Sequence, residues 1–220
     1  GAGSALTTGN SNVAIGNSAL YHNVTGTNNV AIGRDSMGGA SGESNSSNTA
    51  VGYASLMSIT TAAGNTVIGY QSGDAITTSG YNALVGYQAG TALQGGGGLN
   101  VAIGYQPLYL GSGNDGAIAI GTRAGYNSQA SNNVYIGSSA GRENRNGTAQ
   151  VYIGSSAGYY ATGSYNTFVG HDAGKGGTTS APYSSGESNV AVGYAALDAF
   201  TTGDNNIAIG KNAFGALTSA

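Results

Sequence analysis

The chain lacks several residue types on which ordinary globular domains depend. Its 220 residues include no Cys, no Trp, three Phe and two Pro, and only 7% are charged. The absence of Cys excludes disulfides, thiolate chemistry and Cys-ligated metal sites. The formal net charge of -3 offers no basic surface of the kind that binds nucleic acid or anionic lipid. No apolar run has the length of a membrane-spanning helix, so we expect no membrane insertion in this segment.

Glycine, in contrast, is abundant, and it marks a repeat. The motif Asn-Val-Ala-Ile-Gly at 12–16 returns eleven more times with small substitutions, and its final glycines are separated by 17, 19, 17, 17, 18, 17, 16, 17, 16, 23 and 17 residues. A period near 17 is typical of a solenoid built from stacked supersecondary units. The motif is short and rich in β-branched residues, which favours a strand. We therefore predict an all-β solenoid of about 12 coils.

The repeats fill the chain, so residues 1–220 form a single repeat array. Neither end shows the polar cap that solenoids need, and we expect a fragment of a longer fibrous protein. The repeat is lengthened at residues 38–47, 95–98 and 175–187, the last of which accounts for the 23-residue step. Insertions in solenoids map to surface loops, so surface loops are expected at these three places.

One position of the motif, directly before the glycine, is always Ile or Val. Because strand side chains alternate between two faces, we expect this residue and the one two before it to point into the lumen of the coil. The predicted lumen core consists of Ile15, Ile32, Val51, Ile68, Val85, Ile103, Ile120, Ile136, Ile153, Val169, Val192 and Ile209.

The residue between these two points to the opposite face and is apolar in every repeat. A strand that is apolar on both faces usually lies between two buried layers, and a single coil supplies only one. The second layer is therefore expected to be another copy of the chain. The predicted interface between chains consists of Ala14, Ala31, Ala50, Val67, Leu84, Ala102, Ala119, Tyr135, Tyr152, Phe168, Ala191 and Ala208.

The repeated Asn-x-Ala-Ile-Gly resembles the head repeat of trimeric autotransporter adhesins of the YadA-like kind. The longer form, at 65–73 and 82–90 with a turn such as Thr-Thr-Ser-Gly, is more similar to repeats of bacteriophage tail-fibre proteins, and the 17-residue step favours the fibre. The resemblance implies a left-handed parallel β-roll assembled as a homotrimer, with the predicted interface close to a three-fold axis.

The same resemblance implies a function. The chain would be a structural and adhesive segment of a virion tail fibre, which presents a host-binding tip or contributes to binding a host cell-surface glycan or protein receptor. The head of a bacterial trimeric autotransporter adhesin, at the bacterial cell surface, is the alternative. A second alternative is a solenoid whose flat face binds a repetitive ligand such as ice or polysaccharide.

Aromatic side chains supply the best candidates for receptor contact. Four tyrosines directly follow the glycine in consecutive repeats, so their rings should form a row along the solenoid. Such a row is either a structural ladder of stacked rings or a stripe on which sugar rings pack. The candidate glycan or receptor contacts are Tyr53, Tyr70, Tyr87, Tyr105 and Tyr183.

Other polar residues favour structure over chemistry. The Asn that opens the motif should form an amide ladder along the solenoid. His22 and His171 lie outside any metal-ligand spacing, and the acids, such as Asp35, Glu143 and Asp172, have no partner at a fixed spacing. No nucleophile–base pair can be assembled from the sequence. We therefore expect no enzyme activity, no metal and no cofactor.

Overall fold

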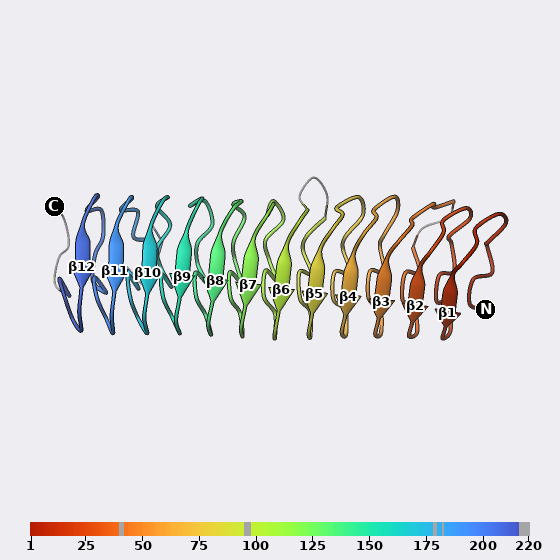
Figure 1. Ribbon diagram of the computed structural model, residues 1–220, viewed down its shortest axis with the longest axis horizontal. Coiled ribbons are helices and arrows are strands. Elements are labelled where there is room, and N and C mark those ends of the chain that lie inside the picture. Colours follow the sequence, from red (N-terminus) through yellow and green to blue (C-terminus); the bar gives the residue numbers. More distant parts are fainter. Residues whose placement is uncertain (40–41, 95–97, 178–179, 182, 216–220) are drawn as a thin grey trace.

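The computed structural model describes residues 1–39, 42–94, 98–177, 180–181 and 183–215. These residues wind into a parallel β-solenoid without any helix, and its turns stack along one long axis (Figure 1). Strands β1 (Val13–Ile15) and β12 (Ile207–Ile209) lie at opposite ends of the stack. Within the three predicted insertions, residues 40–41, 95–97, 178–179 and 182 lie outside the described residues.

Each turn contributes one three-residue strand to a single twelve-stranded parallel sheet, whose order follows the sequence. Neighbouring strands pair in register, so each motif position stacks on the same position of the next turn. The twelve strands delimit about eleven turns, which confirms the predicted solenoid and its period near 17 residues. The remaining strands are β2 (Val30–Ile32), β3 (Thr49–Val51), β4 (Thr66–Ile68), β5 (Ala83–Val85), β6 (Val101–Ile103), β7 (Ile118–Ile120), β8 (Val134–Ile136), β9 (Val151–Ile153), β10 (Thr167–Val169) and β11 (Val190–Val192).

The interior of the coil is lined by the middle residue of each strand, so the predicted assignment of the two faces is wrong. Ala102 is fully buried within one chain, whereas its neighbour Ile103 is 40% exposed and Ile15 is 58% exposed. The predicted lumen residues all lie half-buried or exposed on the outer side: Ile15, Ile32, Val51, Ile68, Val85, Ile103, Ile120, Ile136, Ile153, Val169, Val192 and Ile209.

The residues predicted at the interface between chains lie inside the coil instead. Apart from the half-buried Ala14 of the end strand, each is at most 1% exposed in the single chain, which leaves no surface for a partner. These residues are Ala14, Ala31, Ala50, Val67, Leu84, Ala102, Ala119, Tyr135, Tyr152, Phe168, Ala191 and Ala208.

The opening Asn of the motif explains why this face is the inner one. It lies two residues before the middle residue and therefore points to the same side. Along most of the solenoid this Asn is buried, as at Asn48 and Asn65. A buried amide must find hydrogen-bond partners on every side, and only the closed interior of the coil provides them in each turn.

The amides form the predicted ladder. Asn29 Oδ1 accepts a hydrogen bond of 3.0 Å from the Asn48 main-chain N–H, and Asn48 Nδ2 donates to the Ala62 carbonyl across the coil at 2.9 Å. Gln150 takes the place of Asn in the turn before Asn166, whose N–H it accepts at 2.8 Å. The ladder is interrupted at Ala117, where the side chain is missing. The amide row thus ties each strand both to the next strand and to the returning chain of its own turn.

The glycine that ends each motif is required by the close approach of successive turns. Gly104 has φ +134°, in the region that favours glycine, and a Cβ there would lie 2.7 Å from the carbonyl oxygen of Gly121. The same contact recurs from turn to turn along the solenoid. Any other residue at this position would force two turns apart.

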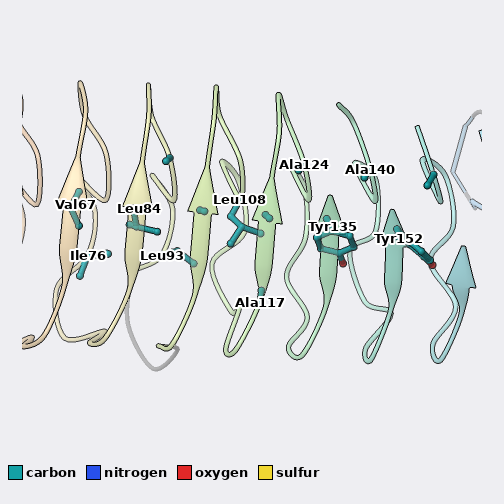
Figure 2. Packing of buried hydrophobic residues seen from close by; sticks show 14 of the residues in the cluster. Val67, Ile76, Leu84, Leu93, Leu108, Ala117, Ala124, Tyr135, Ala140 and Tyr152 are labelled. Atoms are coloured by element: carbon teal, nitrogen blue, oxygen red, sulfur yellow. The ribbon is translucent and has the colours of Figure 1, made fainter. Parts of the chain in front are cut away.

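Two positions of the interior change size in opposite directions, and a third, nine residues after the middle residue, adds Ile59, Ile76, Leu93 or Phe200 in four turns (Figure 2). The second position lies six residues after the middle residue of the strand. Where the middle residue is Ala, the second residue is large: Ala14/Leu20, Ala31/Met37, Ala50/Leu56, Ala102/Leu108 and Ala191/Leu197. Where the middle residue is larger, the second is Gly: Val67/Gly73, Leu84/Gly90, Tyr135/Gly141, Tyr152/Gly158 and Phe168/Gly174.

The turn that carries Ala119 and Gly125 has two small residues. The ring of Tyr135 from the next turn takes the space, since a Cβ on Gly125 would lie 2.6 Å from that ring and 2.9 Å from Leu108. The ring of Tyr135 therefore fills the space that the two small residues leave, as close packing demands.

This complementarity predicts a strong coupling between Leu84 and Gly90. Leu84→Ala should lower the free energy of unfolding by about 2–5 kcal/mol through the cavity it leaves. Gly90→Leu should also destabilise, by about 1–3 kcal/mol, because its Cβ would lie 3.0 Å from Leu84 and 2.9 Å from Leu93. The double variant recreates the Ala50/Leu56 arrangement, in which Ile59 stands at the position of Leu93. In chemical denaturation, the double variant should lose less free energy of unfolding than the two single variants lose together. Additive losses would contradict the pairing.

Two tyrosines in the interior differ in how their hydroxyls are satisfied. Asn144 Nδ2 donates to Tyr135 Oη at 2.7 Å, and Ser128 Oγ lies 3.2 Å from the same oxygen. The Tyr152 hydroxyl is buried and has no hydrogen bond of good geometry, and the Asn166 side chain beside it donates to the Gly186 carbonyl and accepts from the Asn189 N–H. Burial raises the pKa of both phenols above the ordinary value of 10.0. Both rings therefore stay neutral, but only one hydroxyl contributes to stability.

Removing the two hydroxyls should accordingly have opposite effects. Tyr135→Phe should lower the free energy of unfolding by about 1 kcal/mol, since Asn144 and Ser128 lose a buried partner. Tyr152→Phe should leave it unchanged or raise it by up to about 1 kcal/mol, because an unpaired buried hydroxyl is removed. Paired melting curves measure the difference. A larger loss for Tyr152→Phe than for Tyr135→Phe would show that the Tyr152 hydroxyl is bound.

Candidate functional site

The four predicted tyrosines form a stacked row on the outside of the coil. Ring centroids of Tyr53 and Tyr70 lie 5.2 Å apart, those of Tyr70 and Tyr87 5.3 Å, and those of Tyr87 and Tyr105 5.2 Å, with interplanar angles of 15°, 4° and 6°. The predicted structural ladder is therefore confirmed. Each inner ring covers the faces of its neighbours, so a ligand can reach mainly ring edges and hydroxyls. Glycan contact by these four residues stays a prediction.

Arginines extend this row in both directions, a feature that sequence reasoning missed. The Arg34 guanidinium lies 5.6 Å from the Tyr53 ring centroid at one end, and that of Arg123 lies 5.9 Å from Tyr105 at the other. Arg123 also lies 5.6 Å from the ring of Tyr126, which belongs to a second row because it stacks on Tyr109, with ring centroids 5.2 Å apart, in the same turn as Tyr105. Each cation over a ring contributes about 0.5–1 kcal/mol at such exposed sites.

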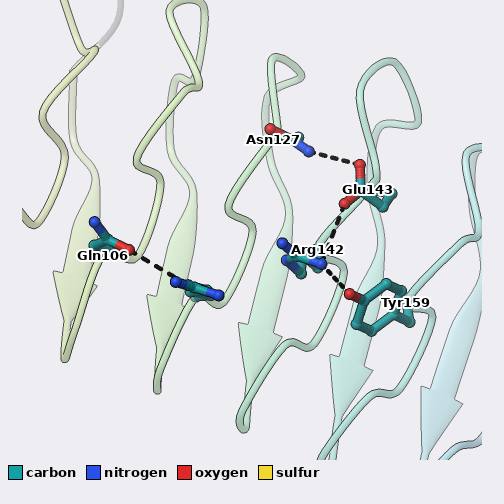
Figure 3. A network of polar contacts seen from close by, with 6 residues as sticks. Gln106, Asn127, Arg142, Glu143 and Tyr159 are labelled. Atoms are coloured by element: carbon teal, nitrogen blue, oxygen red, sulfur yellow. Dashed lines mark hydrogen bonds and ion pairs between the residues drawn. The ribbon is translucent and has the colours of Figure 1, made fainter.

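The second row combines a cation with rings. Arg142 lies 5.4 Å from the Tyr126 ring and 5.3 Å from the Tyr159 ring, and it also donates to the Tyr159 hydroxyl (Figure 3). Glu143 balances its charge at 3.6 Å and accepts a hydrogen bond of 2.6 Å from Asn127. Arg123 thus joins the tyrosine row to a second row, which consists of Tyr109, Tyr126, Arg142 and Tyr159.

A second amide row accompanies the tyrosines. Gln88 Nε2 donates to Gln71 Oε1 at 3.0 Å, and Gln106 donates to Gln88 at 2.9 Å. Arg123 Nε donates to Gln106 at 3.3 Å, at the end of the row that Figure 3 shows. In the sequence these glutamines follow the tyrosines directly, as in Tyr70-Gln71 and Tyr87-Gln88, which is a signal that could have predicted the row.

The remaining sequence candidates lie apart from this row. Tyr183 is half-buried and stacks on Tyr160, with ring centroids 5.7 Å apart. His171 pairs with Asp172 at 3.2 Å and stacks on Tyr194, while the ring of His22 meets Tyr21 edge-on. Within the described part of the chain, no group of three or more His, Cys, Asp or Glu residues is arranged to hold a metal ion. The described part of the chain also contains no helix that could cross a membrane.

A continuous apolar face covers the outer side of the sheet, and the sequence assigned its residues to the interior. We define the Val/Ile face as the two residues that flank the middle residue in each strand. It contains no charged side chain, and three threonines and one alanine are the only departures from Val and Ile. Its members are Val13, Ile15, Val30, Ile32, Thr49, Val51, Thr66, Ile68, Ala83, Val85, Val101, Ile103, Ile118, Ile120, Val134, Ile136, Val151, Ile153, Thr167, Val169, Val190, Val192, Ile207 and Ile209.

Comparisons with protein-family models, with curated proteins and with solved structures return no match for this chain. The fold and the surfaces described above are thus the basis for a functional assignment.

The carboxyl group of Asp74 lies in a partly buried environment that disfavours its charged form. Burial raises the pKa of Asp74 above its ordinary value of 3.8, against the opposing effect of hydrogen bonds from the Asp74 and Ala75 main-chain groups. Its Oδ1 atom is buried without a hydrogen-bond partner. The folded chain therefore binds the Asp74 proton more tightly than the unfolded chain does.

This shift predicts a pH-dependent effect of Asp74→Asn. The contribution of Asp74 to the free energy of unfolding falls as the pH rises through 3.8 and above, because the unfolded chain then loses its proton first. The neutral amide should raise the melting temperature at pH 7, and the gain should shrink towards acidic pH. Asp198→Asn, at the equivalent position of a later turn, is the control. A gain that does not vary with pH would contradict this interpretation.

Proposed function

We propose that this chain is a shaft segment of a homotrimeric adhesive fibre. In this assembly three left-handed parallel β-rolls pack through their Val/Ile faces, and Ala14 and its equivalents take no part in the contact. The observation that carries the proposal is the Val/Ile face itself, which is apolar from β1 to β12 and faces outward from every turn. Apolar surfaces of this extent mark sites of association.

Energetic considerations support a chain–chain contact. Covering a half-exposed Val or Ile contributes on the order of 1 kcal/mol, and each turn offers two such residues. The in-register stacking of the strands keeps the face regular, so a second copy with the same spacing of turns can match it along the whole length. Three copies around one axis would bury this face and leave the outer walls of the coils free.

The role that fits this assembly is mechanical. The Asn ladder, the stacked tyrosines and the absence of any assembled catalytic pair among the described residues favour a rigid spacer over an enzyme. In the proposal the fibre belongs to a virion tail, where it presents or contributes to the binding of a host cell-surface glycan or protein receptor. The head of a bacterial autotransporter adhesin is the alternative assembly of the same coil.

Binding of ice or of a crystalline ligand is less well supported. A flat ice-binding face would need regular rows of threonine, and the Val/Ile face carries threonine only at Thr49, Thr66 and Thr167. Thermal hysteresis by the isolated chain would favour this alternative over the fibre.

Sedimentation analysis tests the trimer directly. The wild-type chain should sediment as three copies, and Ile103→Asp should shift it towards monomer, because three carboxylates would meet in one layer of the interface. The isolated monomer should keep its β-rich circular dichroism, since Ile103 faces outward.

Two further variants separate assembly from folding. Gln129→Asp adds the same charge in an exposed turn and should leave the trimer intact. Ala102→Glu should instead disrupt the coil, because Ala102 has no exposed surface and the interior offers no partner for a carboxylate. A wild-type chain that sediments as a monomer at micromolar concentration would end the proposal.

A further inference from the structure

Bulky residues occupy an unfavourable backbone position in three turns. The residue before the motif Asn has a positive φ in every turn, and it is usually Ser, Asn or Gly. Tyr81, Leu99 and Tyr165 break this pattern with φ values of 58°, 60° and 62°. Large side chains adopt positive φ elsewhere in this chain too, but there, as at Leu56 and Leu108, the side chain is fully buried in the core.

Burial of the side chain does not compensate for the positive φ at Tyr81 and Leu99. Tyr81 is 69% exposed and Leu99 is 65% exposed, so neither side chain contributes to the core. The Tyr81 ring is instead seated against the chain of the preceding turn, where a Cβ on Gly64 would lie 2.6 Å from the ring. Gly64 therefore makes room for a fixed and accessible aromatic ring.

Tyr81 and Leu99 belong to consecutive turns and line the same hollow, whose volume is about 400 Å³. Hydroxyl groups of Thr61 and Thr78 and the carboxyl group of Asp115 complete its wall. Asp115 Oδ1 accepts a hydrogen bond of 3.2 Å from the Gly98 N–H, which orients the carboxylate. The wall draws on four successive turns, so the hollow extends for about 14 Å along the solenoid.

We propose that this hollow binds a neutral pyranose unit of a glycan. A pyranose ring has an apolar C–H face, which matches the exposed Tyr81 ring and Leu99, and a rim of hydroxyls. Asp115 and main-chain carbonyls accept hydrogen bonds from that rim, and the threonine hydroxyls accept or donate them. Among the described residues that line the hollow none is cationic, and Asp115 repels anions, so the site disfavours sialic and uronic acids.

The site lies within one chain and does not depend on the trimer. Saturation-transfer NMR with lactose, maltotriose and cellotriose as neutral probes, and trigalacturonic acid, which is acidic on every unit, as the acidic probe, tests it on the wild-type chain. We expect binding of at least one neutral probe and none of trigalacturonic acid. Absence of every neutral signal, or binding of trigalacturonic acid alone, would overturn the site.

Variants assign the binding to this hollow. Tyr81→Ser and Asp115→Asn should each lower the affinity for the neutral probe by about tenfold or more. Ser stands at the equivalent position of three other turns, at residues 11, 47 and 188, so Tyr81→Ser should keep its melting temperature. The matched control is Tyr165→Ser, because Tyr165 has the same backbone conformation but lies outside the hollow. This variant should bind the neutral probe as tightly as the wild-type chain does.

Two results with these variants would count against the proposal. Unchanged affinity in both Tyr81→Ser and Asp115→Asn would show that the sugar binds elsewhere. A smaller sedimentation coefficient for Tyr81→Ser would assign the hollow to a contact between chains, and it would leave the fibre proposal in place.

Discussion

The hydrogen bonds of the buried Asn row are the constraint on which the rest of this structure depends. Each amide joins the strand of its own turn to the next strand and to the carbonyl of its returning chain, as at Asn48. Such groups cannot be left unpaired inside a protein, so the row fixes both the register of the sheet and the identity of its inner face. The glycines that end the strands then allow successive turns to approach closely.

Once the inner face is fixed, the middle residue of the strand and the residue six positions later share one space in the interior. The opposite changes in size at Leu84/Gly90 and Ala102/Leu108 are the consequence. Packing in the interior does not restrict the size of the outward-facing side chains, and each outer position is repeated at the spacing of the strands. Rows on the surface follow from this repetition: the Val/Ile face, the tyrosine row with its arginines, and the hollow beside Tyr81. A solenoid of this kind turns any residue repeated in sequence into a continuous surface feature.

The sequence by itself determined the strands, their period, the parallel stacking, the Asn ladder and the row from Tyr53 to Tyr105. All of these depend only on which residues recur at a fixed spacing. The connection through Arg123 to the second row, which contains Arg142, was not predicted, because these arginines stand at different distances from the preceding glycine. Their side chains meet the rings only once the turn between them has its three-dimensional shape.

Only the tertiary structure decided which face of the strand is inside. Alternation along a strand separates Ala102 from Ile103 but does not say which of them faces the lumen, and the constancy of the Ile or Val position favours that position for the lumen. The closed coil reverses that choice, because the inner face must also hold the Asn amides, which need buried hydrogen-bond partners. The hollow at Tyr81 has the same origin, since its wall combines residues from four turns that the sequence keeps apart.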